Sequence, residues 1–104
     1  MPKQYRVIVL PEAFQNLDRI IEHIRKHSVQ NAIATTDRLW AEIQSLSELP
    51  HRYETYRPTR KPERSVRSMA VPPFIVYYRV IESPPTVRIL TVRHGASRQP
   101  KRFK

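Results

Sequence analysis

The chain has 104 residues, with nineteen Lys or Arg against nine Asp or Glu and 39% apolar residues, so it carries a formal net charge of +10. This length and composition indicate one globular domain with a modest core, and the lack of cysteine excludes disulfides, thiolate nucleophiles and cysteine zinc sites. No apolar run approaches the ~20 residues of a membrane span, and the N-terminus lacks a signal-peptide stretch, so we expect a soluble cytoplasmic protein.

The first half of the chain predicts a strand followed by two helices. Residues 5–10 are rich in β-branched and aromatic residues, which is typical of a strand. Pro11 suits the first turn of a helix, and apolar residues then recur at spacings of three and four as far as Ile24. Ser28 is a candidate N-cap for a second helix, whose apolar period continues until Pro50. The short connection between the two predicts an antiparallel helical hairpin, with Trp40 in its apolar stripe.

The second half predicts a basic loop over residues 50–65, three strands over residues 66–71, 74–81 and 86–94, and a basic tail over residues 98–104. We expect the tail to be mobile unless a partner orders it. The strand over residues 5–10 is not stable alone, so we expect it to pair with the later strands. The predicted fold is therefore α+β, a single domain over residues 1–104 in the order β-α-α-β-β-β, with an antiparallel sheet, an αα-hairpin packed on one face and the other face left for a partner.

Positive charge is concentrated in this second half. Residues 1–49 hold six basic and six acidic residues, whereas residues 50–104 hold thirteen basic and three acidic residues. The asymmetry predicts one electropositive working face and an acidic or polyanionic partner. Ile75, Tyr77 and Arg79 alternate onto one face of their strand, which we expect to be this face, together with either Arg93 or His94, because the register between the strands stays open.

His94 is the one candidate for a general acid or base in this region. The alternative interpretation is that this histidine has only a structural role at the end of its strand. The only glycine, Gly95, follows it, and we expect a positive φ there at the exit from the sheet. His23 and His27 have the i, i+4 spacing of a metal pair, but no third ligand is placed by the sequence. We therefore predict no metal and no cofactor.

The order of elements and several segments resemble the ParE/RelE superfamily of toxins from bacterial type II toxin–antitoxin, or plasmid stabilisation, modules. The resemblance covers about residues 4–98, and the segments that carry it are Tyr5–Val9 followed by Pro11–Ala13, Leu17 with Ile20–Ile24, Leu46 with Leu49–Pro50, Arg67 ahead of Ile75–Val80, and Val87–Leu90 leading to Val92–Gly95.

The superfamily has two main activities. RelE-like members are ribosome-dependent mRNA endonucleases and typically carry an arginine early in the third strand, where this chain has Ile75. ParE-like members bind DNA gyrase and block it. The Tyr78–Arg79 pair and the His94–Gly95 ending resemble ParE-like proteins more closely, although Ser97 stands where those proteins often have an arginine.

The resemblance therefore implies a ParE-like toxin that inhibits DNA gyrase by protein binding, has no assigned catalytic residue and is neutralised by an acidic antitoxin in a hetero-oligomer. The partner-binding residues are expected to be Arg67, Arg79, Arg93, Arg98, Lys101, Arg102 and Phe103. One alternative is a RelE-like mRNA endonuclease acting at the ribosome, with Arg79, Arg93 and His94 as its catalytic groups. Another is a basic nucleic-acid-binding module that stacks bases on the Tyr53 and Tyr56 loop.

Overall fold

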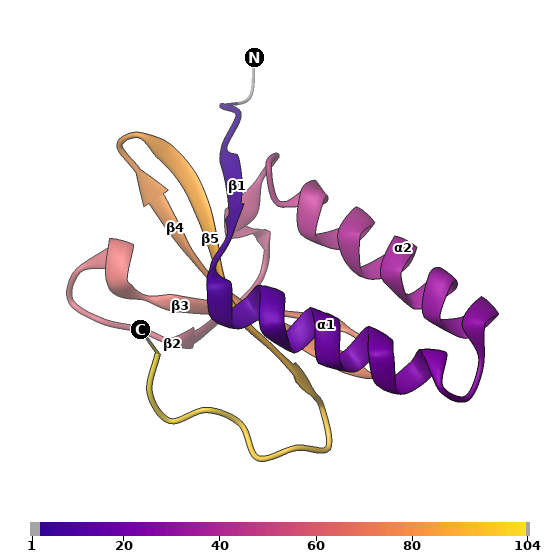
Figure 1. Cartoon of the computed structure of the whole chain (residues 1–104). Helices are drawn as coiled ribbons and strands as arrows, with labels where there is room; N and C mark the ends of the chain where they lie inside the picture. Colours follow the sequence, from indigo (N-terminus) through magenta and orange to yellow (C-terminus); the bar gives the residue numbers. More distant parts are fainter. Residues whose placement is uncertain (1–2, 104) are drawn as a thin grey trace.

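A computed structural model describes residues 3–103, without the side chains of residues 57 and 62 (Figure 1). The elements follow in the order β1 (Arg6–Val9), α1 (Pro11–Arg25), α2 (Val29–Ser45), a 3₁₀ turn (Pro50–Arg52), β2 (Thr55–Arg57), a second 3₁₀ turn (Pro62–Arg64), β3 (Val66–Val71), β4 (Phe74–Glu82) and β5 (Pro85–His94). The predicted α+β fold and element order are confirmed, with β2 as an additional three-residue strand inside the region predicted as a loop.

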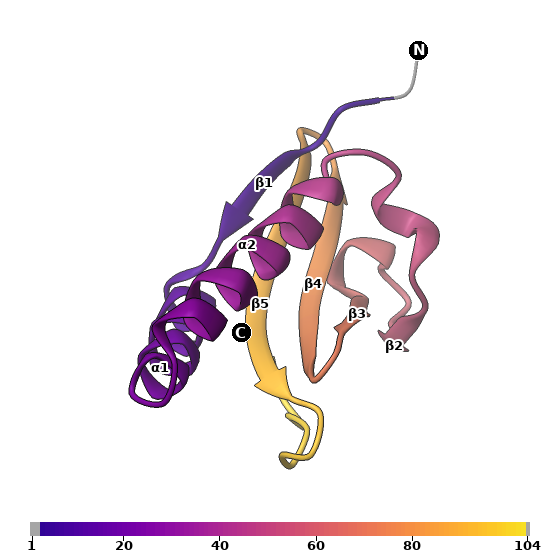
Figure 2. The same cartoon turned by 90° about the vertical axis from the view of Figure 1, so that its right-hand side faces the viewer.

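The two helices form the predicted hairpin and lie on the same side of the sheet (Figure 2). Pro11 occupies the first turn of α1, and the Ser28 hydroxyl caps α2 by accepting from the Asn31 N–H at 3.2 Å. The second helix ends at Ser45, earlier than Pro50, because the chain turns before the proline and Leu49 adopts a left-handed conformation with φ 48°. Neither helix of the described residues is long and apolar enough to cross a membrane.

The sheet has the strand order β1-β5-β4-β3-β2 and is mixed. The meander of β3, β4 and β5 is antiparallel as predicted, but the prediction of an entirely antiparallel sheet is wrong, because β1 runs parallel to β5. The helical hairpin returns the chain to the start of β1, where the Tyr5 N–H donates to the Ser47 carbonyl at 2.9 Å. The strands β3, β4 and β5 then alternate in direction, so that β5 runs parallel to β1.

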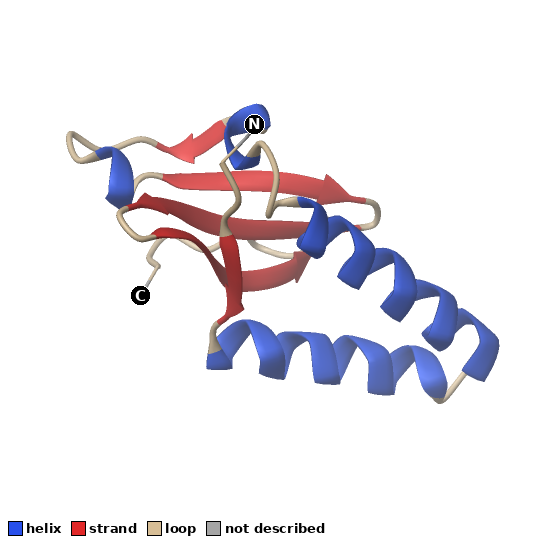
Figure 3. Ribbon diagram, turned by 90° about the horizontal axis from the view of Figure 1, so that it is seen from above, coloured by secondary structure: helices blue, strands red, loops and turns tan. Residues whose placement is uncertain are grey.

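Each face of the sheet has its own apolar cluster. The main core lies between the sheet and the helices, and includes Leu17, Leu39, Ile43, Met69 and Tyr78 as fully buried side chains, with Trp40 packed against it. Figure 3 shows the turn between the two helices projecting beyond the ends of the strands. The opposite face, called the distal face below, has a smaller cluster in which Val66, Tyr77 and Leu90 are buried and Leu10, Ile75 and Phe103 pack against them.

Candidate functional site

The pairing of β4 with β5 decides which predicted residues share the distal face. Tyr77 lies opposite Thr91 while Tyr78 lies opposite Ile89, so β5 has an additional residue in a bulge and its simple alternation is broken there. Beyond the bulge, Arg93 lies opposite Ile75 on the distal face, whereas His94 lies opposite Phe74 on the side of the helices. Paired residues point to the same face. The distal face therefore carries Arg79 together with Arg93, and not with His94.

Three arginines gather near the β4–β5 turn, at one end of the distal face. These arginines are Arg64, Arg79 and Arg88. Together with Glu63 and Ile81 they line a depression of about 440 Å³, which we call the arginine pocket. Arg79 and Arg88 lie directly opposite each other on neighbouring strands. The Arg79 Nε donates to the Arg64 carbonyl at 3.1 Å, which ties β4 to the second 3₁₀ turn.

The electrostatics of the arginine pocket are those of crowded like charges. Partial burial lowers the pKa of Arg79, and the neighbouring guanidinium groups of Arg64 and Arg88 lower it further. Sequence reasoning found Arg79 but did not assign a role to Arg64 or Arg88. The turn between these strands could have predicted their pairing. A tight turn at residues 83–84 places Glu82 opposite Pro85, and counting back along both strands places Arg79 opposite Arg88.

Aromatic side chains occupy the middle of the distal face. The ring centroids of Tyr56 and Tyr77 are 4.9 Å apart, and Phe103 lies 5.3 Å from Tyr77 and 6.1 Å from Tyr56. Burial raises the pKa of Tyr77, and the adjacent Tyr56 raises it further. The Tyr77 hydroxyl donates to the side-chain carbonyl of Gln99, whose amide in turn donates to the Ser97 carbonyl at 2.8 Å.

The C-terminal tail is thus held against the sheet, and the expectation of a free tail is not met for its described part. Figure 1 shows it leaving the end of β5 and turning back beneath the strands. Phe103 is half-buried against the chain's own aromatic residues, while Arg98, Lys101 and Arg102 stay exposed. Lys104, the last residue of the predicted tail, lies outside the described residues.

Arg67 has a different position from the other predicted partner-binding residues. It lies opposite Tyr78, whose side chain belongs to the main core, so it is on the side of the helices. Its Nη1 donates to the Tyr53 carbonyl at 2.8 Å and to the His51 carbonyl at 3.4 Å. Arg67 therefore holds the loop after α2 in place, away from the arginine pocket.

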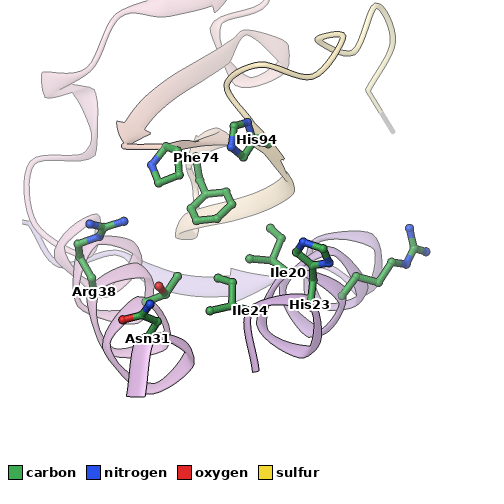
Figure 4. Close-up of a pocket in the computed structure, with 10 residues that line it drawn as sticks. Ile20, His23, Ile24, Asn31, Arg38, Phe74 and His94 are labelled. Atoms are coloured by element: carbon green, nitrogen blue, oxygen red, sulfur yellow. The ribbon is translucent and has the colours of Figure 1, made fainter. Parts of the chain in front are cut away.

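His94 lies beside a groove between the helices and the β3–β4 turn. The groove has a volume of about 680 Å³, and Figure 4 shows Phe74 directed across it toward Ile20 and Ile24 of α1. The His94 ring meets the Phe74 ring edge-on at 5.7 Å, and its Nδ1 accepts from the Ala96 N–H at 3.0 Å. These contacts are those of a histidine that closes the end of a strand.

The three groups that an mRNA endonuclease would use do not share one site. Arg79 lines the arginine pocket, while Arg93 and His94 line a groove of about 490 Å³ beside α1 that does not include Arg79. The Arg93 Nε points to the Thr91 hydroxyl at 3.4 Å. The arrangement therefore supplies cationic and aromatic contacts across a surface, and it does not bring His94 beside the arginine cluster, where Glu63 is the one acidic residue.

Gly95 lies at a close approach of two backbone segments, where a side chain would be tightly placed. Its N–H donates to the Pro73 carbonyl at 2.7 Å, and a Cβ at this position would lie 3.2 Å from that oxygen. The expected positive φ is wrong, because no described glycine has one. His23 and His27 meet edge-on at 5.3 Å, and within residues 3–103 no three His, Cys, Asp or Glu side chains come together to hold a metal ion.

Glu82, at the end of β4, is neutralised on the side of the helices. Its carboxylate accepts from the Tyr5 hydroxyl at 2.6 Å and pairs with Lys3 at 3.2 Å and His51 at 2.8 Å. The hydrogen bond from Tyr5 is the main cause that lowers the pKa of Glu82. This acid is therefore occupied elsewhere and does not offset the arginines of the distal face.

Comparison with known proteins identifies the class. A solved structure described as the chromosomal ParDE TA system from P. aeruginosa superposes with a TM-score of 0.68 at 19% identity, covering 88% of this chain and 97% of that one. A second, the toxin–antitoxin complex RelBE2 from Mycobacterium tuberculosis, gives a TM-score of 0.56 at 24% identity, covering 90% and 94%. No curated protein matches the chain. The shared fold is that of the ParE/RelE toxins.

The family itself is given by a sequence model. The model described as the ParE toxin of type II toxin–antitoxin system, parDE, matches residues 7–98, which is most of the chain. The chain belongs to this ParE toxin family, and the predicted placement on the ParE-like side of the superfamily is confirmed.

Proposed function

We propose that the protein is a toxin that inhibits DNA gyrase by binding it in the cytoplasm, and that a cognate acidic antitoxin neutralises it by covering the distal face. The observation that carries the proposal is the arrangement of the distal face, which has three arginines around one depression and the exposed ring of Tyr56 packed on the buried Tyr77. Glu63 is the one acidic residue that lines this depression, and no histidine lines it. Such a surface is suited to binding a macromolecule rather than to proton transfer.

The antitoxin part of the proposal follows from charge. Arg64, Arg79 and Arg88 lie at one end of the distal face, and the tail carries exposed Arg98, Lys101 and Arg102. A disordered acidic segment can wrap such a surface and gain electrostatic attraction as it orders. The two solved structures that resemble this chain are described as a ParDE system and a RelBE2 toxin–antitoxin complex, which supports the same kind of partner here.

The choice of gyrase over mRNA rests on the family match and on the separation of the alternative catalytic groups. A general acid must come within hydrogen-bond reach of the leaving oxygen that it protonates, while the charge-stabilising arginine must reach the same phosphate. Arg79 and His94 lie on opposite faces of the sheet, so these two groups cannot act on one phosphate without a rearrangement of the strands. Arg93 is the one arginine of the alternative set that lines a groove with His94.

Purified protein added to a gyrase supercoiling reaction tests the proposal. We expect inhibition of supercoiling by the wild type and by His94→Ala, with relief on addition of the cognate antitoxin. A ribosome-dependent mRNA cleavage assay is run in parallel with the same two proteins. Cleavage of mRNA by the wild type, abolished in His94→Ala and accompanied by unaffected gyrase, would overturn the proposal.

A further inference from the structure

The arginine pocket contains an arrangement that is unfavourable for the protein alone. Arg79 and Arg88 lie directly opposite each other on neighbouring antiparallel strands, and like charges in that position destabilise a sheet. Arg64 adds a third guanidinium to the same depression, and Glu63 is the one acidic residue that lines it. The pocket therefore retains an excess of positive charge that a bound anion would offset.

The three guanidinium groups also come from three different elements. Arg64 lies in the second 3₁₀ turn, Arg79 in β4 and Arg88 in β5. Planar carboxylates are satisfied by a single guanidinium fork, whereas a tetrahedral phosphate presents oxygens in several directions and can accept from all three groups at once. Arg64 and Arg88 are exposed and Arg79 is half-buried, so the pocket is open to a ligand from solvent.

The neighbouring part of the distal face is compatible with a nucleic-acid ligand. Tyr77 lies two residues before Arg79 on the same face of β4 and is buried, so the 39% exposed Tyr56, which stands edge-on to it, is the ring that a base could reach. Phe103 and the tail cover this aromatic region, but none of the tail residues lines the arginine pocket. The pocket is thus accessible while the tail is docked.

We propose that the arginine pocket binds a phosphate group, of the kind carried by a nucleic-acid backbone. This site does not depend on the proposed inhibition of gyrase, and it is tested with the isolated full-length protein.

The first measurement is thermal unfolding in millimolar sodium phosphate, compared with sodium acetate and sodium chloride at the same ionic strength. At a phosphate concentration ten times the Kd, ligand linkage predicts a rise in Tm of about 6 °C over chloride. Arg88→Gln should raise the Tm in chloride, because the like-charge pair is removed, and should lose the response to phosphate. Lys26→Gln, which removes one charge at the end of α1, is the matched control and should keep that response.

The second measurement separates the sources of the phosphate. Binding of a fluorescent single-stranded oligonucleotide is followed across a salt series for the wild type and both variants. A nucleic-acid ligand predicts that Arg88→Gln, and not Lys26→Gln, lowers the magnitude of the salt slope by about 0.7, which corresponds to one phosphate contact. A phosphate response with no pocket-dependent oligonucleotide binding would instead assign the site to a small phosphorylated ligand.

The proposal fails if acetate raises the Tm as much as phosphate, or if Arg88→Gln keeps the full phosphate response. None of these outcomes depends on whether the protein inhibits gyrase, so the two proposals can fail separately.

Discussion

Phe103→Ala tests whether the tail is docked on the sheet, which determines how any truncation of the tail is interpreted. The Phe103 ring packs against two aromatic rings at centroid distances of 5.3 and 6.1 Å and is half-buried. The two aromatic pairs together contribute about 1–3 kcal/mol beyond burial, and the half-burial of the ring adds about 1 kcal/mol. Freeing the backbone of residue 103 recovers about 1–2 kcal/mol of entropy. We therefore expect a net loss of about 1 kcal/mol in the free energy of unfolding.

This loss corresponds to a fall in Tm of about 4–8 °C for a domain of this size. Urea unfolding gives the free energy, and hydrogen exchange should show faster exchange confined to the tail and to β2 beside Tyr56. Phe103→Tyr is the control, because it keeps the ring and should retain most of the stability. Unchanged stability and unchanged exchange in Phe103→Ala would refute the docked tail, and a truncation after Gly95 would then report on partner contacts alone.

Three further predictions concern single side chains. Asn16→Ala should lower the free energy of unfolding, measured in urea, by about 2–3 kcal/mol. The Asn16 Oδ1 accepts from the buried Thr91 hydroxyl at 2.7 Å, at a part of β5 that does not pair with β1. A loss below about 0.5 kcal/mol would contradict this role. The pKa of Glu82 is lowered in the folded protein, so its contribution to stability is complete above its ordinary pKa of 4.5 and is lost as the pH falls through the lower folded value. Glu82→Gln should therefore make the free energy of unfolding less dependent on pH on the acid side. An unchanged pH dependence would show that the hydrogen bond from Tyr5 is not formed in solution. His94→Ala should leave gyrase inhibition within about twofold of the wild type in a supercoiling assay, provided that circular dichroism shows a folded protein, and a complete loss of inhibition would give His94 a direct role.

The fold was largely predictable because the helices and the three long strands have strong periodic patterns. The α1 stripe, the Ser28 cap and the β3–β5 meander all correspond to local signals in the sequence. The parallel pairing of β1 was not predictable in the same way, because it depends on where the helical hairpin returns the chain. The three residues of β2 lie among prolines and carry no alternation long enough to recognise.

The candidate site was predicted only in part. Arg79 was placed on the correct face by alternation, but the bulge in β5 decides that Arg93, and not His94, shares this face, and alternation alone cannot show that. The positive charge of the tail suggested a free segment, whereas its single aromatic residue, Phe103, finds an apolar cluster formed by residues distant in sequence. Both differences arise from tertiary packing, which a local pattern does not contain.

The central claim, that this ParE-family protein acts on gyrase, is tested most directly by controlled expression in bacterial cells, with gyrase-dependent DNA breaks and the rate of protein synthesis measured in the same culture. We predict DNA breakage and induction of the SOS response while translation is initially intact, and suppression of both effects in cells whose gyrase does not bind the protein. Prompt translational arrest with cleaved mRNA and intact DNA would contradict the account.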